Sequence, residues 1–426
     1  VVMASSVLIL SAIALLLASA PIFLALLAGT VVGFEFFGPA MPPVVLAQRL
    51  VEGVNVFSIL AVPLFVYAAD IISRGEIGER LVRLMESLVG HITGGLAIAT
   101  VLTCAMFGAI SGIGAAAVVS IGPIVYPSLL RHGYSRSFSV GLILTASTLS
   151  MLIPPSVAMI LYSVQVSVSV SQVFLAGLGT GLIFVIGLSA YCVIYAVRHK
   201  LGRQERMLFR QQLRALQRGL IPMGLPILIF GGIYGGIFTP TEAAAAACVY
   251  AAIVETLVFR RLKLRELFRL SQGSSITIAT LLILIAAGST MTWFMTLERV
   301  PAMLAAMMSE VPDLVVLAAI NVLVLIIGMF IDPNSAVIVI SPLIAPAAMA
   351  VGVDSVHLGA IIVFNLAIGM ITPPFGLNIF IGMSTFKISY AEIMRAVLPF
   401  IGVAIVSLLA ITYFPQLIMW LPELAR

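Results

Sequence analysis

The residues best suited to chemistry in this sequence surround two proline doublets, Pro154-Pro155 and Pro373-Pro374. The nearby polar or small residues are Ser147, Thr148, Ser150 and Ser156 at the first doublet, and Asn365, Gly369, Thr372 and Asn378 at the second. Two successive prolines remove backbone donors and clash with the preceding turn, so we expect each doublet to unwind a helix. The freed carbonyls, with hydroxyl and amide oxygens, are hard ligands that suit a small cation such as sodium.

A single doublet is more simply explained as a structural kink. Here, however, the second doublet follows the first by 219 residues, and other breakers repeat at the same offset. These are Pro21 and Pro240, Pro123 and Pro342, Pro127 and Pro346, and Gly133 and Gly352. Breakers in apolar surroundings fix where helices stop, so a shared pattern implies a repeated fold unit. Paired broken helices favour a binding site over a kink.

Two apolar stretches, 92–130 and 312–351, are too long for one span, and each is interrupted at half-length. The interruptions are Ser111-Gly112-Ile113-Gly114 and Asp332-Pro333-Asn334-Ser335. Each stretch is either two spans or a re-entrant hairpin. The polar break favours a hairpin, because irregular backbone at membrane depth is tolerated when protein surrounds it. Asp332 is a functional candidate there, and the alternative is a capping role in its own turn.

Other polar groups indicate structure rather than catalysis. Asp70 is expected at the cytoplasmic interface, and Glu242, after Thr239-Pro240-Thr241, is expected to cap a helix. The four histidines form no ligand cluster, and the sequence contains neither H-E-x-x-H nor a Walker A motif. We therefore predict no enzyme activity.

The composition requires a membrane protein. The 426 residues are 62% hydrophobic and only 9% charged, and the apolar runs have the length of spanning helices. We expect an all-α polytopic protein with spans near 3–18, 20–37, 56–73, 138–170, 171–197, 219–238, 240–259, 272–296, 355–388 and 396–421. Segments 43–55, 74–90, 201–218, 259–271 and 297–311 are expected to be interfacial or loop helices.

Basic residues set the orientation. With both hairpins re-entrant, all of the 22 Lys and Arg residues except Arg49, Arg299 and Arg426 fall on one side, which the positive-inside rule makes cytoplasmic. Residues 1–197 form the first repeat and 219–426 the second, each with five spans and one hairpin. Because five is odd, the repeats are inverted. Residues 198–218, with Arg206, Arg210 and Arg214 at helical spacing, form a basic linker helix on the cytoplasmic surface.

Two longer motifs carry a family resemblance. They are Gly-Gly-Ile-Phe-Thr-Pro-Thr-Glu-Ala-Ala at 235–244 and Asn-Leu-Ala-Ile-Gly-Met-Ile-Thr-Pro-Pro-Phe-Gly-Leu-Asn at 365–378. Arg-His-Gly-Tyr at 131–134, followed by Ile153-Pro154-Pro155-Ser156, is a third element. Together they resemble the large membrane subunit of the tripartite ATP-independent periplasmic (TRAP) transporters.

The resemblance implies an elevator-type transporter of the bacterial inner membrane. A transport domain, made of the hairpins with spans 56–73, 138–170, 272–296 and 355–388, would slide against a scaffold formed by the other spans. It would import an organic acid, such as a sialic acid or a C4-dicarboxylate, on a sodium gradient. It would require a small four-span membrane subunit and a soluble periplasmic substrate-binding protein.

The resemblance also assigns site residues. The sodium positions of the family fall on Gly328, Gly369, Thr372 and Phe375, and the internal offset adds Gly108, Ser150, Ile153 and Ser156. Substrate contacts fall on Ser111, Ser156 and Asp332. The first tip departs from common members, because Ile113-Gly114 replaces a more hydroxyl-rich run.

Three other functions compete with this one. A stand-alone sodium symporter for dicarboxylates or citrate would share the inverted repeats but would need no binding protein. A channel would conduct without saturation, and paired hairpins disfavour it. An intramembrane enzyme would need a paired catalytic constellation, which the sequence lacks.

Overall fold

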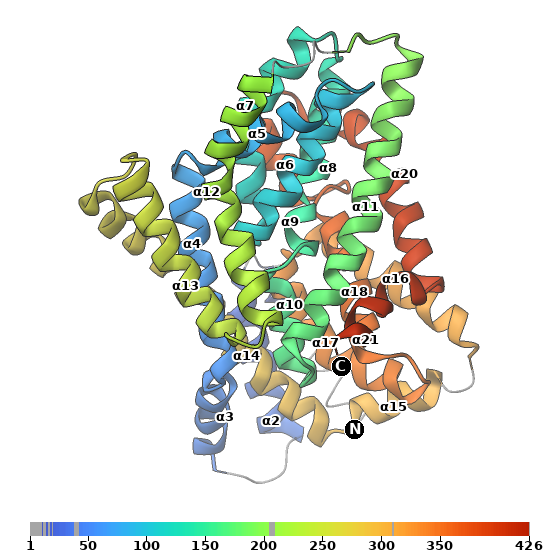
Figure 1. Cartoon of the computed structure of the whole chain (residues 1–426). Coiled ribbons are helices and arrows are strands. Elements are labelled where there is room, and N and C mark those ends of the chain that lie inside the picture. The colour runs from blue at the N-terminus through green and yellow to red at the C-terminus, as the bar shows by residue number, and fades with distance from the viewer. Residues whose placement is uncertain are drawn as a thin grey trace.

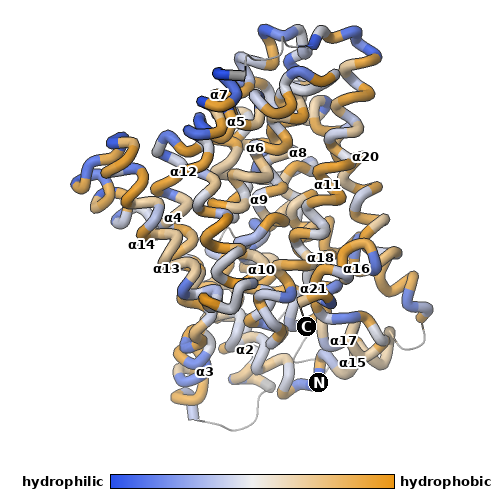
Figure 2. The backbone as a smooth tube through the Cα atoms, viewed as in Figure 1, coloured by the Kyte–Doolittle hydropathy of each residue, from blue (hydrophilic) through white to orange (hydrophobic). Residues whose placement is uncertain are grey.

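The computed structural model describes residues 11, 14–15, 18, 20–37, 42–203, 209–308 and 311–425. Most of the predicted span 3–18 and linker residue Arg206 lie outside these ranges. In the described part of the chain, nine helices are long and apolar enough to cross a membrane, which agrees with the predicted all-α membrane fold. Hydrophobic residues fill the middle of the molecule, and hydrophilic residues gather at its upper end (Figure 2).

The described residues of the first half form eleven elements. They are α2 (Ile22–Phe37), α3 (Val44–Val54), η1 (Phe57–Leu60), α4 (Ala61–Arg74), α5 (Ile77–Val89), α6 (Gly95–Ser111), α7 (Gly114–Arg131), α8 (Arg136–Ser147), α9 (Leu149–Leu152), α10 (Val157–Val166) and α11 (Val170–Arg198). Helices α6 and α7 form the first hairpin, and α8 to α10 form the first broken span.

The second half repeats this plan. Its elements are α12 (Phe209–Tyr234), α13 (Pro240–Ile253), η2 (Val254–Val258), α14 (Leu264–Leu297), α15 (Val300–Met308), α16 (Asp313–Phe330), α17 (Pro333–Ala350), α18 (Ser355–Gly369), α19 (Leu377–Phe386), α20 (Tyr390–Tyr413) and α21 (Gln416–Leu424). Helices α16 and α17 form the second hairpin, and α18 and α19 form the second broken span.

Several helices begin at the polar residues that the sequence places before apolar runs. Thr239 and Glu242 form a reciprocal capping box at α13, which confirms the structural role predicted for Glu242. Ser135 caps α8, and its hydroxyl accepts a hydrogen bond from the Phe138 amide.

Asp70 of α4 accepts a hydrogen bond from the Ser274 hydroxyl of α14, so it joins these two helices.

Not every repeated proline ends a helix. Pro123 and Pro127 lie inside α7, and Pro342 and Pro346 lie inside α17. The expectation that these breakers mark helix ends was therefore wrong. Prolines are tolerated inside membrane helices because neighbouring groups satisfy the freed carbonyls.

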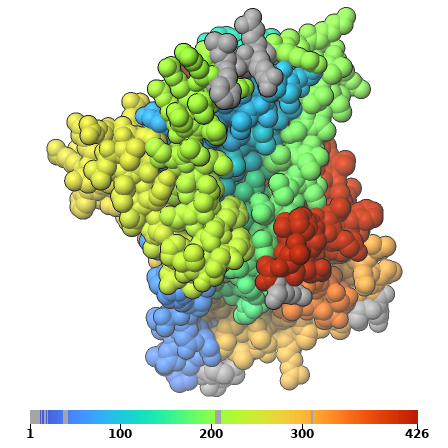
Figure 3. Space-filling view, viewed as in Figure 1, coloured from blue at the N-terminus to red at the C-terminus, as the bar shows by residue number. Residues whose placement is uncertain are grey.

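The linker also differs from the prediction. Residues 209–218 do not form a separate helix. They form the first turns of α12, which continues through Pro222 and Pro226 to Tyr234. At the other end of the chain, the predicted span 396–421 divides into α20 and α21 near Pro415. The connection between η2 and α14 projects from one flank of the molecule (Figure 3).

The two hairpins lie in opposite halves of the molecule. The first is in the upper half of Figure 1 and the second in the lower half. Each hairpin packs against the broken span of its own repeat and also against that of the other. Helix α7 contacts α19, and α10 contacts α17. The repeats are thus intertwined, and the two broken spans meet at the centre of the molecule.

A buried carboxylate also links the repeats. Glu255 of η2 is fully buried and accepts hydrogen bonds from the amides of Glu76 and Ile77, at the start of α5. A Cβ added to Gly75 would lie 2.0 Å from this carboxylate, so a larger residue there would displace the Glu255 side chain. A negative group at a helix N-terminus satisfies free amides and favours the helix dipole. Glu255 therefore fixes where α5 begins.

Candidate functional site

The first break separates α9 from α10. Residues Ile153 to Ser156 are non-helical, the Pro154-Pro155 bond is cis, and Ser156 caps α10 by accepting a hydrogen bond from the Met159 amide. All four residues are buried. The doublet therefore unwinds the span as predicted.

The tip of the first hairpin lies directly against this break. Gly112 has a φ of 64°, and a Cβ there would lie 2.3 Å from the carbonyl oxygen of Pro155. One turn earlier, a Cβ on Gly108 would lie 2.4 Å from the Cα of Ser150. Neither position accepts a side chain without displacing backbone. The two glycines thus bring the tip and the break into backbone contact.

Three buried hydroxyls surround this contact, those of Ser111, Ser150 and Ser156. The Ser150 hydroxyl donates a long hydrogen bond of 3.4 Å to the carbonyl of Cys104. The Ser111 hydroxyl accepts one of 3.5 Å from the Ile113 amide. Because these bonds are at the limit of hydrogen-bond length, both oxygens retain capacity for a stronger partner.

The second hairpin approaches the second break in the same way. A Cβ on Gly369 would lie 2.4 Å from the carbonyl carbon of Gly328. The break itself runs from Met370 to Gly376, and its Pro373-Pro374 bond is also cis. The Thr372 hydroxyl donates to the carbonyl of Ile368 at 2.7 Å, which leaves oxygen lone pairs free to accept.

The first tip and the second break also meet each other. A Cβ on Gly114 would lie 3.3 Å from the Ser147 carbonyl oxygen and 3.5 Å from Cε of Met370. The Asn378 amide group donates to the Ser147 hydroxyl at 2.9 Å. The predicted polar residues Ser147 and Asn378 are therefore joined across the repeats.

The arrangement offers oxygen ligands and little else. It supplies helix-end carbonyls, hydroxyls and amide oxygens, and the described residues contain no cluster of His, Cys, Asp and Glu that could hold a metal ion. Oxygen ligands of this kind suit a hard monovalent cation, and broken helix ends can also meet an anionic group.

Comparison with known proteins identifies the family. Residues 9–417 match the family described as "Tripartite ATP-independent periplasmic transporter, DctM component". The chain belongs to the TRAP transporter large permeases. It is 41% identical to the ectoine/5-hydroxyectoine TRAP transporter large permease protein UehC of Ruegeria pomeroyi, with 98% of each chain covered. It is 38% identical to the ectoine TRAP transporter large permease protein TeaC of Halomonas elongata, with 99% of each covered.

Further relatives are named as TRAP permeases for C4-dicarboxylates, isethionate or sialic acid. Among solved structures, the chain resembles the crystal structure of the Alcanivorax borkumensis YdaH transporter, with a TM-score of 0.67, 16% identity and coverage of 94% and 98%. That likeness supports the fold. This TRAP permease is thus a multi-pass inner-membrane protein of a secondary transport family, and its relatives are permeases rather than enzymes.

The remaining predicted residues of the TRAP permease lie at the second hairpin. Asp332 caps α17 by accepting hydrogen bonds from the amide and the hydroxyl of Ser335. The capping role foreseen as the alternative is therefore present. Phe375 is 54% exposed, and its ring lies 5.3 Å from that of Phe330 beside the tip. In the first repeat, Ile153 is 7% exposed and fills the space beside Gly181 of α11.

Sequence reasoning missed a buried chain of polar side chains in the second repeat. The Asn365 amide donates to the Asn321 carbonyl oxygen at 2.6 Å, and the Asn321 amide donates to the Thr412 hydroxyl at 3.1 Å. The Oδ1 atoms of Asn365 and Asn378 are buried without a hydrogen-bond partner. Asn321 is the single amide side chain in the apolar sequence of α16. That isolated polar residue could have marked Asn321 as a buried hydrogen-bonding group from the sequence alone.

Proposed function

We propose that this TRAP permease carries out sodium-coupled uptake of a small carboxylate-bearing solute by an elevator movement. One observation supports the proposal above the others. Each hairpin tip contacts the break of its own repeat through glycine backbone, at Gly108 and Ser150 and at Gly328 and Gly369. Two equivalent contacts, one in each repeat, are the arrangement expected when a binding site lies between the repeats.

The proposed sodium sites lie at these two contacts. Gly108, Ser150, Ile153 and Ser156 would supply the first, and Gly328, Gly369, Thr372 and Phe375 the second. Main-chain oxygens would be the principal ligands, because most of these residues have no side-chain oxygen. The hydroxyls of Ser150 and Thr372 each donate to a backbone carbonyl, so their own lone pairs point elsewhere.

The proposed substrate contacts are Ser111, Ser156 and Asp332. Hydroxyls and helix-end amides would meet the carboxylate, and bound sodium would add positive charge nearby. Asp332 would face a cationic, amine or hydroxyl group of the solute. Such a pairing suits a zwitterion such as ectoine, for which the two relatives described above are named. Sialic acid, which offers hydroxyls, is the next candidate, and a plain dicarboxylate follows.

The proposal includes two partners, a small membrane subunit and a soluble periplasmic binding protein. The isethionate relative supports the first, because it is named DctMQ and the match with this chain covers 60% of its length. The rest of that protein leaves room for a fused second subunit. The elevator movement would carry the hairpins and broken spans together, past the scaffold helices.

Reconstitution tests the proposal. The permease, its small subunit and its binding protein are placed in proteoliposomes, and uptake of labelled ectoine, sialic acid and a C4-dicarboxylate is measured with and without a sodium gradient. We expect saturable, sodium-dependent uptake of one of them. Sodium-independent uptake would exclude the coupling. Equal uptake by the permease alone would favour the stand-alone symporter.

Two variants test the substrate residues. Ser111→Ala and Asp332→Asn should impair uptake and leave the protein folded in the membrane. Ser163→Ala and Asp313→Asn are matched controls, because the Ser163 hydroxyl bonds within its own helix and Asp313 is exposed at the start of α16. Normal uptake by both test variants would remove these residues from the site.

A further inference from the structure

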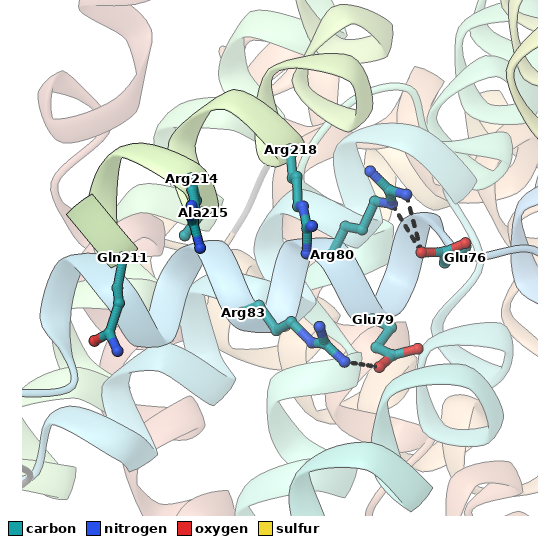
Figure 4. Close-up of a pocket in the computed structure, with 8 residues that line it drawn as sticks. All are labelled: Glu76, Glu79, Arg80, Arg83, Gln211, Arg214, Ala215 and Arg218. Atoms are coloured by element: carbon teal, nitrogen blue, oxygen red, sulfur yellow. Dashed lines mark hydrogen bonds and ion pairs between the residues drawn. The ribbon is translucent and has the colours of Figure 1, made fainter. Parts of the chain in front are cut away.

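A charged cavity of about 240 Å³ lies between α5 and α12, remote from the hairpin tips (Figure 4). Its walls are two helix faces. On α5 the lining residues are Glu76, Glu79, Arg80 and Arg83, and on α12 they are Gln211, Arg214, Ala215 and Arg218. Both sets follow the spacing i, i+3, i+4 and i+7, which places each set on one face of its helix. The cavity is therefore formed by two facing polar stripes.

The packing between the two helices holds these stripes together. A Cβ on Gly219 would lie 2.6 Å from a methyl carbon of Leu84, so α12 approaches α5 closely at this point. The two helices are also joined by a hydrogen bond of 3.4 Å from the Gln212 side-chain amide to the Ser87 carbonyl. Glu255 fixes the start of α5, one turn before Arg80. The cavity walls are thus set by tertiary contacts rather than by flexible loops.

The cavity has an excess of positive charge. Arg80 pairs with Glu76 at 3.0 Å and its guanidinium stacks on Phe259 at 3.8 Å, while Arg83 pairs with Glu79. Among the residues that the structure describes, neither Arg214 nor Arg218 forms an ion pair with a carboxylate. Figure 4 shows both side chains pointing from α12 toward α5. Two arginines thus remain available to an anion.

The surroundings of the cavity are those of a membrane boundary. On α12, Leu213, Leu216 and Leu220 are 43%, 45% and 56% exposed, on the face of the helix opposite the cavity. From Arg210 onward, α12 is also apolar enough to span the membrane. The cavity lies at the end of the molecule where the basic loops gather, which the positive-inside rule places in the cytoplasm. An anion bound here would therefore lie near the level at which α12 enters the membrane.

We propose that this cavity binds the phosphate headgroup of an anionic phospholipid from the cytoplasmic leaflet. Arg214 and Arg218 contact the phosphate. Guanidinium groups match phosphate oxygens in geometry and charge. Basic pockets between membrane helices on this side are suited to acidic headgroups. The position of the cavity where α12 enters the membrane favours a lipid over a soluble phosphate, and a bound lipid would join α5 of the first repeat to α12 of the second.

Lipid retention by the purified full-length protein tests this proposal. Native mass spectrometry and thermal unfolding in neutral detergent are measured with added phosphatidylglycerol, phosphatidylcholine or inorganic phosphate. We expect wild type to retain and be stabilised by phosphatidylglycerol alone. In Arg214→Gln/Arg218→Gln the apparent affinity should fall by about tenfold or more. Arg260→Gln/Arg265→Gln is the matched control, because it removes two exposed arginines outside the cavity and should bind as wild type does.

Three results would overturn the proposal. Equal retention of phosphatidylglycerol and phosphatidylcholine by wild type would exclude headgroup recognition, and this result needs no variant to fold. Stabilisation by inorganic phosphate equal to that by the lipid would assign the site to a soluble anion. An equal loss of affinity in the control variant would show that only net surface charge matters.

Discussion

The two breaks share a backbone plan but differ in their surroundings. Around the first break, every residue from Met151 to Ile160 is buried. Around the second, Pro374, Phe375 and Leu377 are exposed, while Thr372 and Asn378 beside them are buried. The first break is sealed by α11 and the first hairpin, whereas the second is open along one side. The repeated prolines therefore set the backbone, and the neighbouring side chains set access to it.

The two breaks also differ in their polar side chains. The first break has small hydroxyls, and the second adds the amides of Asn365 and Asn378 and the chain through Asn321 to Thr412. At the 219-residue offset, Asn365 corresponds to Ala146 and Thr372 to Ile153. Only the second break can therefore contribute side-chain oxygens at these positions. At two other corresponding pairs the difference is reversed, because Ser150 corresponds to Gly369 and Ser156 to Phe375.

The largest effect should come from filling the glycine contacts. Gly369→Ala and Gly108→Ala each bring a methyl group within 2.4 Å of backbone. Overpacking of this kind should cost ~1–3 kcal/mol of stability and abolish uptake. Thermal unfolding in detergent and reconstituted uptake measure the two effects. Gly402→Ala is the matched control, since no atom lies within 4 Å of its added Cβ. Wild-type behaviour of Gly369→Ala would disprove the contact between tip and break.

The buried polar chain should give the next largest effect. Thr412→Val removes the acceptor of the Asn321 amide and leaves that donor buried, which should cost ~1–2 kcal/mol. Thr290→Val is the control, because both threonines are 1% exposed but the Thr290 hydroxyl bonds only within its own helix. Equal melting temperatures for the two variants would show that the chain does not contribute to stability.

The sodium proposal gives a smaller and more specific effect. Thr372→Val keeps the side-chain shape and removes an oxygen, so half-maximal activation should need roughly fivefold more sodium, equivalent to ~1 kcal/mol. Ile153→Val at the corresponding first-repeat position should leave sodium activation almost unchanged. Sodium titrations of uptake, at matched amounts of protein, distinguish the two. An identical shift in both variants would contradict the assigned difference between the breaks.

The smallest effect is expected at the open side of the second break. Phe375→Leu loses the ring contact with Phe330, which lies 5.3 Å away, and should cost only ~0.5 kcal/mol because the ring is half exposed. Its unfolding temperature should stay close to that of wild type. A loss as large as that of Gly369→Ala would mean that this side is closed in the functional assembly.

Local patterns in the sequence were sufficient for the elements of the fold. The proline doublets do unwind two spans, Ser111–Gly114 and Asp332–Ser335 do mark two turns, and Thr239 and Glu242 do cap α13. These features depend on nearby residues alone. The sequence did not show that Pro123 and Pro342 would stay inside helices, because neighbouring helices decide that outcome.

Contacts between distant residues were the part that sequence patterns could not supply. The approach of Gly328 to Gly369 and the chain from Asn365 to Thr412 join elements far apart in the sequence. Glu255 was missed because its partners are backbone amides 178 residues away or more, and amides have no sequence signature. Residue types predict what a site can bind, but packing decides which residues meet.

The carboxylate of Glu255 has a consequence for biosynthesis. The amides that it satisfies lie at the start of α5, yet the ribosome makes Glu255 only after the whole first repeat, the linker, α12 and α13 have been translated. During that interval the amides at the start of α5 lack their final acceptor. The first repeat therefore cannot complete its fold before α13 has been inserted. Translation of one uninterrupted chain keeps that waiting period short.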